Sequence, residues 1–301
     1  MAISVHCSAT HIHIVEGSVS GKKLTINSYV SAPVPEGAII NGMIIDEENF
    51  LQALKHMVAN KVLPAKKTVS LVVDSSNIMM RTLAVPLLSN KEVLKHVQRE
   101  LSIYLDDAVE HVYDFAVLQP KLNDGGGSIL AVAAGKPLLE SYVRVFKAAG
   151  LNVSNIRLGA SCQIKLAQFL PAFKDQTFIL TQVDGNSLVL TLYDKGNYML
   201  ANRYRLLNTF GSIGWYDEFD DHISSMIQFN KGQKSNNDVS VVYADGLTNA
   251  GVARIRDTLA GFKIAVAPFP FDKAIALPSD AANEFQLGKY QYCVGNLLMK
   301  K

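Results

Sequence analysis

Several side chains near the amino terminus are of types that bind transition metals. His6, Cys7, His11 and His13 lie close together in the sequence. His11 and His13 are two residues apart, so they share one face if this stretch is a strand. Their spacing matches no known zinc signature. We therefore expect no metal here, and interpret these residues as polar groups on a hairpin that lines a solvated cleft.

Two other patterns could in principle support chemistry. Asp106, Asp107 and Glu110 are neighbouring carboxylates of the kind used in acid–base catalysis, but they follow a predicted helix and are typical of a solvated helix end. Residues 123–127 are glycine-rich, yet they lie between predicted strands and not before a helix, which favours a flexible hairpin loop over a phosphate site. No catalytic residue is predicted.

Composition excludes several classes of protein. The chain has 301 residues, of which 49% are hydrophobic, too many for a disordered chain. Lys and Arg total 29 against 27 Asp and Glu, so the charge gives no case for nucleic-acid binding. No apolar run reaches the roughly 18 residues of a membrane span. The sequence does not begin with a basic segment followed by an apolar one, as a secretory signal does. The three cysteines are far apart. These features predict a cytoplasmic protein.

The elements that would position any site repeat along the chain. Residues 3–30 and 177–206 both read as three strands joined by short turns. Asp46 is the expected N-cap of a first helix, and Ser89 with Glu92 forms a capping box before a second. Two like-patterned halves predict a duplicated, two-lobed α/β fold with a cleft between the lobes. Further helices are expected at 138–149, 215–229, 250–259 and 291–299, and further strands at 68–73, 78–85, 109–118, 129–134, 239–243 and 264–266.

Some conspicuous side chains are expected to fill the core. Cys162 and Cys293 lie in apolar helical patterns. Trp215, Tyr216 and Phe219 could anchor a partner, but their helical spacing favours the core.

A set of short motifs in a fixed order carries a family resemblance. They are Pro35–Gly42, Arg81–Ser89, Glu100–Leu105, Tyr113–Leu118 and Lys147–Leu151. With these motifs the chain resembles the PilM family of type IV pilus assembly proteins, which are actin-like and related to the division protein FtsA. The resemblance implies an actin-like (ribonuclease H-like) fold. Its first lobe would span 1–165, with a small inserted α+β subdomain at 77–141. A reduced second lobe would span 166–301, with the final helix 291–299 packing back toward the cleft.

The same resemblance locates the nucleotide cleft and shows that its motifs have changed. The family's first phosphate hairpin reads D-I-G-S-S-S-V-K, and the matching stretch places His6 at the Asp, Ser8 at the Gly and His13 at the Lys, with Thr10 in the turn. Imidazole is a poor ligand for Mg²⁺, and a side chain at position 8 would hinder the approach of phosphate to the backbone.

The other nucleotide motifs also differ from the family pattern. When the second hairpin is aligned with that pattern without a gap, Gln182 takes the position of the Asp and Asp184 that of the Gly. A turn two residues shorter would instead restore an Asp184–Gly185 pair. Asp245 and Gly246 match the Gly-Gly that faces adenosine. The segment between Leu206 and Val239 is also short, and relatives normally place an additional helix there that helps to wall the nucleotide. The resemblance therefore implies a pseudo-ATPase without bound ATP or Mg²⁺; an active ATPase stays the alternative.

The resemblance also implies a partner. PilM-like proteins take the amino-terminal peptide of an inner-membrane, PilN-like protein into a groove between the first and inserted subdomains. Here we expect that groove to be lined by the following residues: Met79, Arg81, Leu83, Val85, Val93, Val97 and Leu101. The expected function is a cytoplasmic scaffold at the inner membrane, with the pilus motor ATPase and self-association as further contacts. A type II secretion scaffold of the GspL kind is a second alternative, although that protein continues into a membrane helix that this chain lacks.

Overall fold

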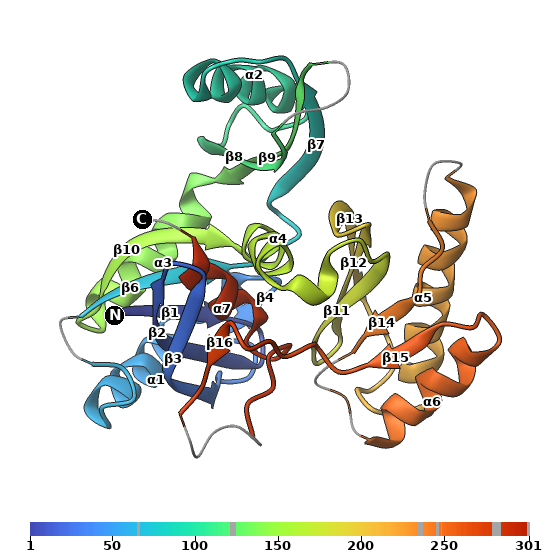
Figure 1. The fold of residues 1–301 in the computed structure, drawn as a ribbon. Helices are drawn as coiled ribbons and strands as arrows, with labels where there is room; N and C mark the ends of the chain where they lie inside the picture. Colours follow the sequence, from blue (N-terminus) through green and yellow to red (C-terminus); the bar gives the residue numbers. More distant parts are fainter. Residues whose placement is uncertain are drawn as a thin grey trace. The chain divides into compact units, whose positions relative to one another are not determined.

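The computed structural model describes residues 1–64, 67–120, 125–233, 237–244, 247, 249–278 and 284–299, and has the predicted α/β composition (Figure 1). The first sheet has the strand order β10-β6-β1-β2-β3-β16. Strand β6 runs parallel to both β1 and β10, and β1 is buried along nearly its whole length, as expected for a central strand. The strands are β1 (Ala2–Cys7), β2 (His11–Ser20), β3 (Lys23–Pro33), β6 (Thr68–Val73), β10 (Asn152–Leu158) and β16 (Ile275–Ala276).

The second sheet repeats the opening meander of the first. Its strand order is β13-β12-β11-β14-β15. Alternate residues of β11 pack on opposite faces: Phe178 and Leu180 join one hydrophobic cluster, whereas Ile179 joins the cluster that includes Trp215 and Phe219. The strands are β11 (Phe178–Asp184), β12 (Ser187–Asp194), β13 (Asn197–Arg205), β14 (Val241–Tyr243) and β15 (Ala265–Ala267), and the helices α5 (Ile213–Gly232) and α6 (Asn249–Ala260) accompany them. The predicted duplication of the meander is confirmed.

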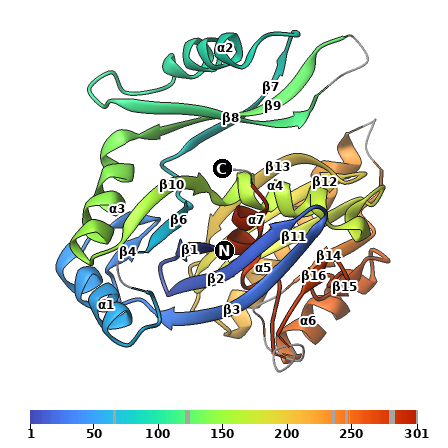
Figure 2. The same ribbon diagram turned by 60° about the vertical axis from the view of Figure 1, so that its left-hand side comes forward.

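An inserted α+β subdomain follows β6. Its sheet has the order β7-β9-β8, and Figure 2 shows α2 lying across one face of it. The elements are β7 (Met79–Val85), α2 (Asn90–Ser102), β8 (His111–Gln119) and β9 (Gly127–Gly135). The predicted capping box is present, because the carboxylate of Glu92 accepts hydrogen bonds from the Ser89 backbone (2.9 Å) and hydroxyl (2.6 Å).

The remaining elements connect these sheets. They are β4 (Ile39–Ile40), β5 (Met43–Ile44), α1 (Glu47–Ala59), α3 (Lys136–Ala148), α4 (Gly159–Phe169), a 3₁₀ turn (Pro171–Phe173) and α7 (Gln291–Leu298). Asp46 caps α1 as predicted, accepting from the Asn49 backbone at 3.0 Å. Sequence patterns missed β4, β5, β10 and β16.

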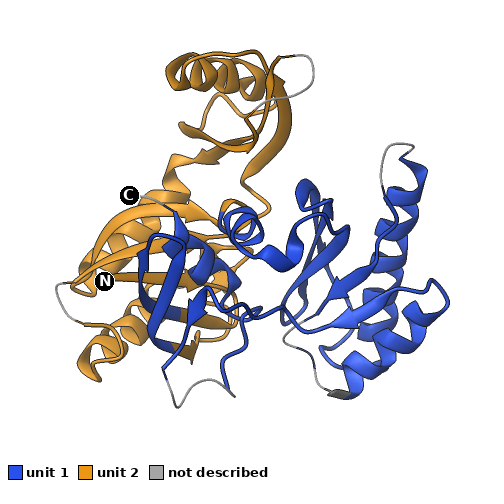
Figure 3. Ribbon diagram, viewed as in Figure 1, with its two compact units in different colours: residues 1, 14–29, 162–301 blue, residues 2–13, 30–161 orange. Residues whose placement is uncertain are grey.

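The chain divides into two compact units (Figure 3). One comprises residues 2–13 and 30–161; the other comprises residue 1, residues 14–29 and residues 162–301. This division is not the same as the predicted lobes 1–165 and 166–301, because residues 14–29 belong to the unit of the later half. The physical reason is that β16 pairs with β3 and the Leu24 backbone donates to Ala274 (2.8 Å), so the early strands complete the core of the later half.

Candidate functional site

The turn of the first predicted phosphate hairpin is closed by its own side chain. The Ser8 hydroxyl accepts hydrogen bonds from the backbone amides of Thr10 (3.3 Å) and His11 (3.0 Å) and donates to the His11 carbonyl (3.0 Å). A hydroxyl has one donor and two lone pairs, so these contacts use its full capacity. Two backbone amides of the turn, those of Thr10 and His11, therefore already have an acceptor within the hairpin.

The histidines of this hairpin form a ladder. The ring of His13 lies between those of His6 and His11, with ring centroids 5.8 and 5.7 Å apart and planes inclined by 18° and 14°. His6 and His13 are buried, and His11 is half-buried, with its Nδ1 2.8 Å from the Thr10 hydroxyl. The prediction that His11 and His13 share a face is confirmed. Across the described residues, no three His, Cys, Asp or Glu side chains are arranged to hold a metal ion.

The second hairpin has a tight turn of two residues. Asp184 pairs with Ser187, and Gly185, between them, has a φ of 57°, which favours glycine. The side chain of Gln182 is half-buried, and its Oε1 accepts a hydrogen bond from Nε2 of Gln291 in α7 at 2.6 Å. This arrangement makes Gln182 a structural partner of the last helix.

Gln291 is the centre of a buried polar network that sequence reasoning did not find. Its Nε2 also lies within hydrogen-bond distance of the backbone carbonyls of Thr181 (3.3 Å) and Gly288 (3.0 Å), and its Oε1 accepts from Nε2 of Gln163 (2.7 Å). Gln163 and Gln291 are each 1% exposed. The available signal was the position of these two glutamines within apolar helical segments, since a glutamine side chain that is buried there needs a hydrogen-bond partner.

The predicted nucleotide positions are distributed over the two compact units. Asp245 and Gly246 lie outside the residues that the structure describes. The first hairpin, with His6, Ser8, Thr10 and His13, belongs to one compact unit, and Gln182, Asp184 and Gly185 belong to the other.

The structure corrects the predicted lining of the partner groove. Val85, Val93, Val97 and Leu101 form the core of the inserted subdomain with Ile129, Ala131 and Ala133. They are at most 6% exposed, so they do not line an open groove. The apolar stripe of α2, which the resemblance assigned to the groove, is the face by which the helix packs on its own sheet.

The other three predicted groove residues lie at alternate positions of β7 and so on one face of the strand. Met79 and Leu83 are half-buried and pack against the same core. Arg81 is exposed, and its guanidinium lies 4.5 Å from the centroid of the Tyr104 ring, a cation–π contact. Strand β7 lies at one edge of the three-stranded sheet.

The surface of the subdomain carries apolar side chains that the sequence patterns did not single out as exposed. Leu87 is 75% exposed and Ile103 72%, and Leu94 and Tyr104 are also exposed. These exposed apolar side chains are available for contact with a partner protein.

The predictions for other residues are met. Asp106, Asp107 and Glu110 are exposed, and Glu110 forms an ion pair with Lys136 (2.8 Å) that raises the pKa of that lysine. The core positions include Cys162, Cys293, Trp215, Tyr216 and Phe219.

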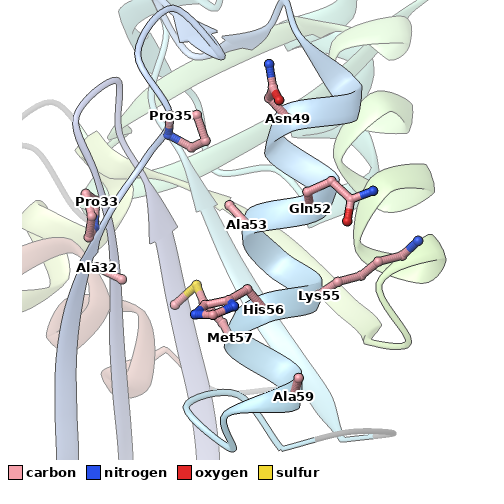
Figure 4. Close-up of a pocket in the computed structure, with 10 residues that line it drawn as sticks. All are labelled: Ala32, Pro33, Pro35, Asn49, Gln52, Ala53, Lys55, His56, Met57 and Ala59. Carbon is pink, nitrogen blue, oxygen red and sulfur yellow. The ribbon is translucent and has the colours of Figure 1, made fainter.

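A groove absent from the sequence predictions lies between α1 and the end of β3. It has a volume of about 830 Å³. Figure 4 shows Ala53, His56 and Met57 of α1 facing Pro33 and Pro35, while the side chain of Lys55 points away from them. Its floor is apolar, and its polar groups do not converge on one point as they do in catalytic sites.

Among the described residues, each helix is too short or too polar to span a lipid bilayer.

Comparison with solved structures shows an actin-like fold. The chain is similar to a structure described as the PilM-PilN type IV pilus biogenesis complex, with a TM-score of 0.78 and 19% identity over 99% of this chain and 97% of that one. It is also similar to a Bacteroides thetaiotaomicron protein of actin-like ATPase fold and unknown function (TM-score 0.52, 10% identity, 99% of this chain and 96% of that chain covered). A further similarity is to the cytoplasmic domain of EpsL, an inner-membrane component of the Vibrio cholerae type II secretion system (TM-score 0.50, 11% identity, 99% of this chain and 95% of that chain covered).

Sequence comparison gives the family. No curated protein matches the chain. The family model described as type IV pilus assembly protein PilM matches residues 4–207, which is more than half of the chain. The chain therefore belongs to the PilM family of type IV pilus assembly proteins.

Proposed function

We propose that this protein is a cytoplasmic scaffold of type IV pilus assembly that binds the amino-terminal peptide of a PilN-like inner-membrane protein and does not hydrolyse ATP. Family membership supports the role in pilus assembly. The similar structure described as a PilM-PilN complex supports a PilN-like partner. Contacts with the motor ATPase and with further copies of this chain stay predictions.

The observation that carries the absence of ATP hydrolysis is the closed turn of the first hairpin. Phosphate-binding turns work because backbone amides point at the anion. Here the Ser8 hydroxyl accepts from two of those amides. The Gln182 side chain, at the position of the family's second Asp in one register, is held by Gln291, and an amide is a weaker ligand for Mg²⁺ than a carboxylate.

Thermal unfolding with and without Mg-ATP tests this part of the proposal. A ligand that binds only the native state at 100 times its Kd adds about 2.7 kcal/mol of stability, which shifts the Tm by several degrees. We expect no shift at millimolar Mg-ATP. A clear rise in Tm, followed by phosphate release above the buffer rate, would replace the scaffold proposal with the active ATPase that uses the Asp184–Gly185 turn.

For the partner peptide, we propose the outer edge of β7. An edge strand offers main-chain groups to an extended segment, which adds as a further strand. The exposed side chains beside this strand include Arg81 and Leu87, a cation and an apolar group that can select the peptide.

Hydrogen exchange with a labelled PilN-like amino-terminal peptide tests the location. We expect fluorescence anisotropy to report binding, and the amides of Met79–Val85 to gain protection. Strand β13 is the matched control, because it also lies at the edge of its sheet, in the other unit. Binding that protects other segments would overturn the β7 location, and a full-length partner that does not bind at all would overturn the scaffold proposal.

A further inference from the structure

The inserted subdomain has its own hydrophobic core, so its orientation depends on its two connections to the lobe. The chain enters it through Asp74–Ile78, after β6, and leaves it through β9 into α3. Both connections contact one short turn, Asn41–Gly42, which joins β4 to β5. Ile40 pairs with Met43, and φ is 50° at Asn41 and 73° at Gly42, so this is a two-residue hairpin turn with both residues in the left-handed region.

The entering connection is held by a reciprocal pair of hydrogen bonds. Nδ2 of Asn41 donates to the Ser76 hydroxyl at 2.6 Å, and the Ser76 backbone amide donates to Oδ1 of Asn41 at 3.0 Å. One residue further along, Nδ2 of Asn77 donates to the Met43 sulfur at 3.0 Å. The side chains of Asn41 and Met43 in the hairpin therefore both form hydrogen bonds with this entering connection.

The turn also packs directly on the end of β6. A Cβ at Gly42 would lie 2.3 Å from the Asp74 carbonyl oxygen and 2.9 Å from the Ser75 Cβ, closer than real contacts allow. Glycine is required here both for φ and for this close approach.

The leaving connection is held at the same turn. The Tyr142 hydroxyl, in α3, donates to the Gly42 carbonyl at 2.9 Å, and its ring packs edge-on against Phe50. Tyr142 is fully buried, and burial raises its pKa well above the usual range, so the phenol keeps the proton that it donates.

We propose that the Asn41–Gly42 turn is a clamp that fixes the angle of the inserted subdomain on its lobe and so positions the peptide-binding strand. The consequence for peptide affinity rests on the proposed function. Asn41 and Gly42 act as positioning residues: they hold the connections and need not touch the peptide.

Distance measurements between two spin labels test the clamp without a peptide. Labels at Leu94→Cys on α2 and Lys55→Cys on α1 report the angle of the subdomain, since both sites are exposed and the native cysteines Cys7, Cys162 and Cys293 are buried. We expect the distance distribution to broaden in Asn41→Ala and in Gly42→Ala.

Matched variants separate the clamp from general destabilisation. Gly37 has a φ of 74°, but a Cβ there meets no atom within 4 Å, so Gly37→Ala introduces similar backbone strain without the clash and should leave the distribution narrow. In Asn41→Asp, the aspartate tolerates a positive φ, and its carboxylate can accept hydrogen bonds from both the backbone amide and the hydroxyl of Ser76. This variant should therefore behave as the wild type.

Peptide affinity is the second measurement. We expect Asn41→Ala to weaken binding of the PilN-like peptide by about three- to tenfold, the equivalent of one lost hydrogen bond, while Gly37→Ala leaves the affinity unchanged. An unchanged distance distribution in Asn41→Ala and Gly42→Ala would overturn the clamp, even with a lowered Tm. If the distribution broadens but the wild type binds no peptide, the clamp stands and the proposed function fails.

Discussion

At the scale of single residues, Ser8 shows how one side chain can complete a turn. Its hydroxyl meets the Thr10 and His11 amides, and Ser8 is only 8% exposed. We expect Ser8→Ala to lower the free energy of unfolding by about 1–2 kcal/mol, because it leaves poorly solvated amides without this acceptor. Urea unfolding of the two proteins, fitted with a common slope, measures the difference. Equal stabilities would mean that water replaces the hydroxyl, and would remove the main support for a closed hairpin.

A second residue-scale prediction concerns the contact between α7 and α4. A Cβ at Gly295 would lie 2.0 Å from the Cys162 carbonyl oxygen, so the helices approach through the bare backbone. We expect Gly295→Ala to destabilise the protein by about 1–3 kcal/mol or more through overpacking. Gly232→Ala is the control, since its Cβ meets no atom within 4 Å near the end of α5. Similar midpoints for both variants in thermal unfolding would contradict the close approach.

At the scale of elements, Asp194 ties the end of β12 to neighbouring segments. Its Oδ1 accepts from the Thr177 hydroxyl (2.7 Å) and from the backbone (3.1 Å) and side chain (2.9 Å) of Asn237. Partial burial raises the pKa of Asp194, but these hydrogen bonds outweigh it and hold the pKa below its ordinary value of 3.8. The stabilisation is therefore present above that pH and is lost as the pH falls further.

Asp194→Asn tests this dependence. The variant should be less stable than the wild type at pH 7, and the gap should shrink as the pH falls below about 4, because the wild-type carboxylate then takes up a proton. Denaturant midpoints measured from pH 7 to pH 3 provide the comparison. A gap that stays constant with pH would show that geometry, and not charge, sets the contribution of this residue.

Elements also show what sequence patterns could and could not predict. The caps at Asp46 and Ser89 were predictable because a cap depends on residues within one turn of the helix. Strand β16 was not, because two residues form a strand only when distant β3 offers its edge. The apolar stripe of α2, with Val93 and Val97, correctly indicated a buried face. Periodicity does not identify the residues that cover such a face. It therefore could not separate these core side chains from the groove that the resemblance implied.

The candidate site was predictable to a similar extent. Motif order gave the family, and the residue types at His6 and Ser8 indicated a changed phosphate hairpin. The hydroxyl that closes the turn and the Gln182–Gln291 contact were not predictable. The second joins residues 109 apart in the chain, and spacing carries no information about such pairs.

At the scale of the whole molecule, the inserted subdomain has a hydrophobic core of its own. It packs around Val97 and Leu101, separately from the two clusters that share the residues of β11. We expect it to open as a cooperative unit below the free energy of global unfolding. In native-state hydrogen exchange at increasing denaturant, amides of α2 and β9 should lose protection together and before those of β12. If the protection of all three elements falls with the same dependence on denaturant concentration, they form a single cooperative unit and this prediction is wrong.

The composition of the two units has a consequence for synthesis on the ribosome. The unit that holds residues 2–13 and 30–161 is complete when little more than half of the chain has been made. The other unit includes residues 14–29, and the outer edge of β3 pairs with β16, so this edge stays unpaired until nearly the whole polypeptide has emerged. During translation this strand edge is exposed to chaperones and to mispairing with neighbouring nascent chains.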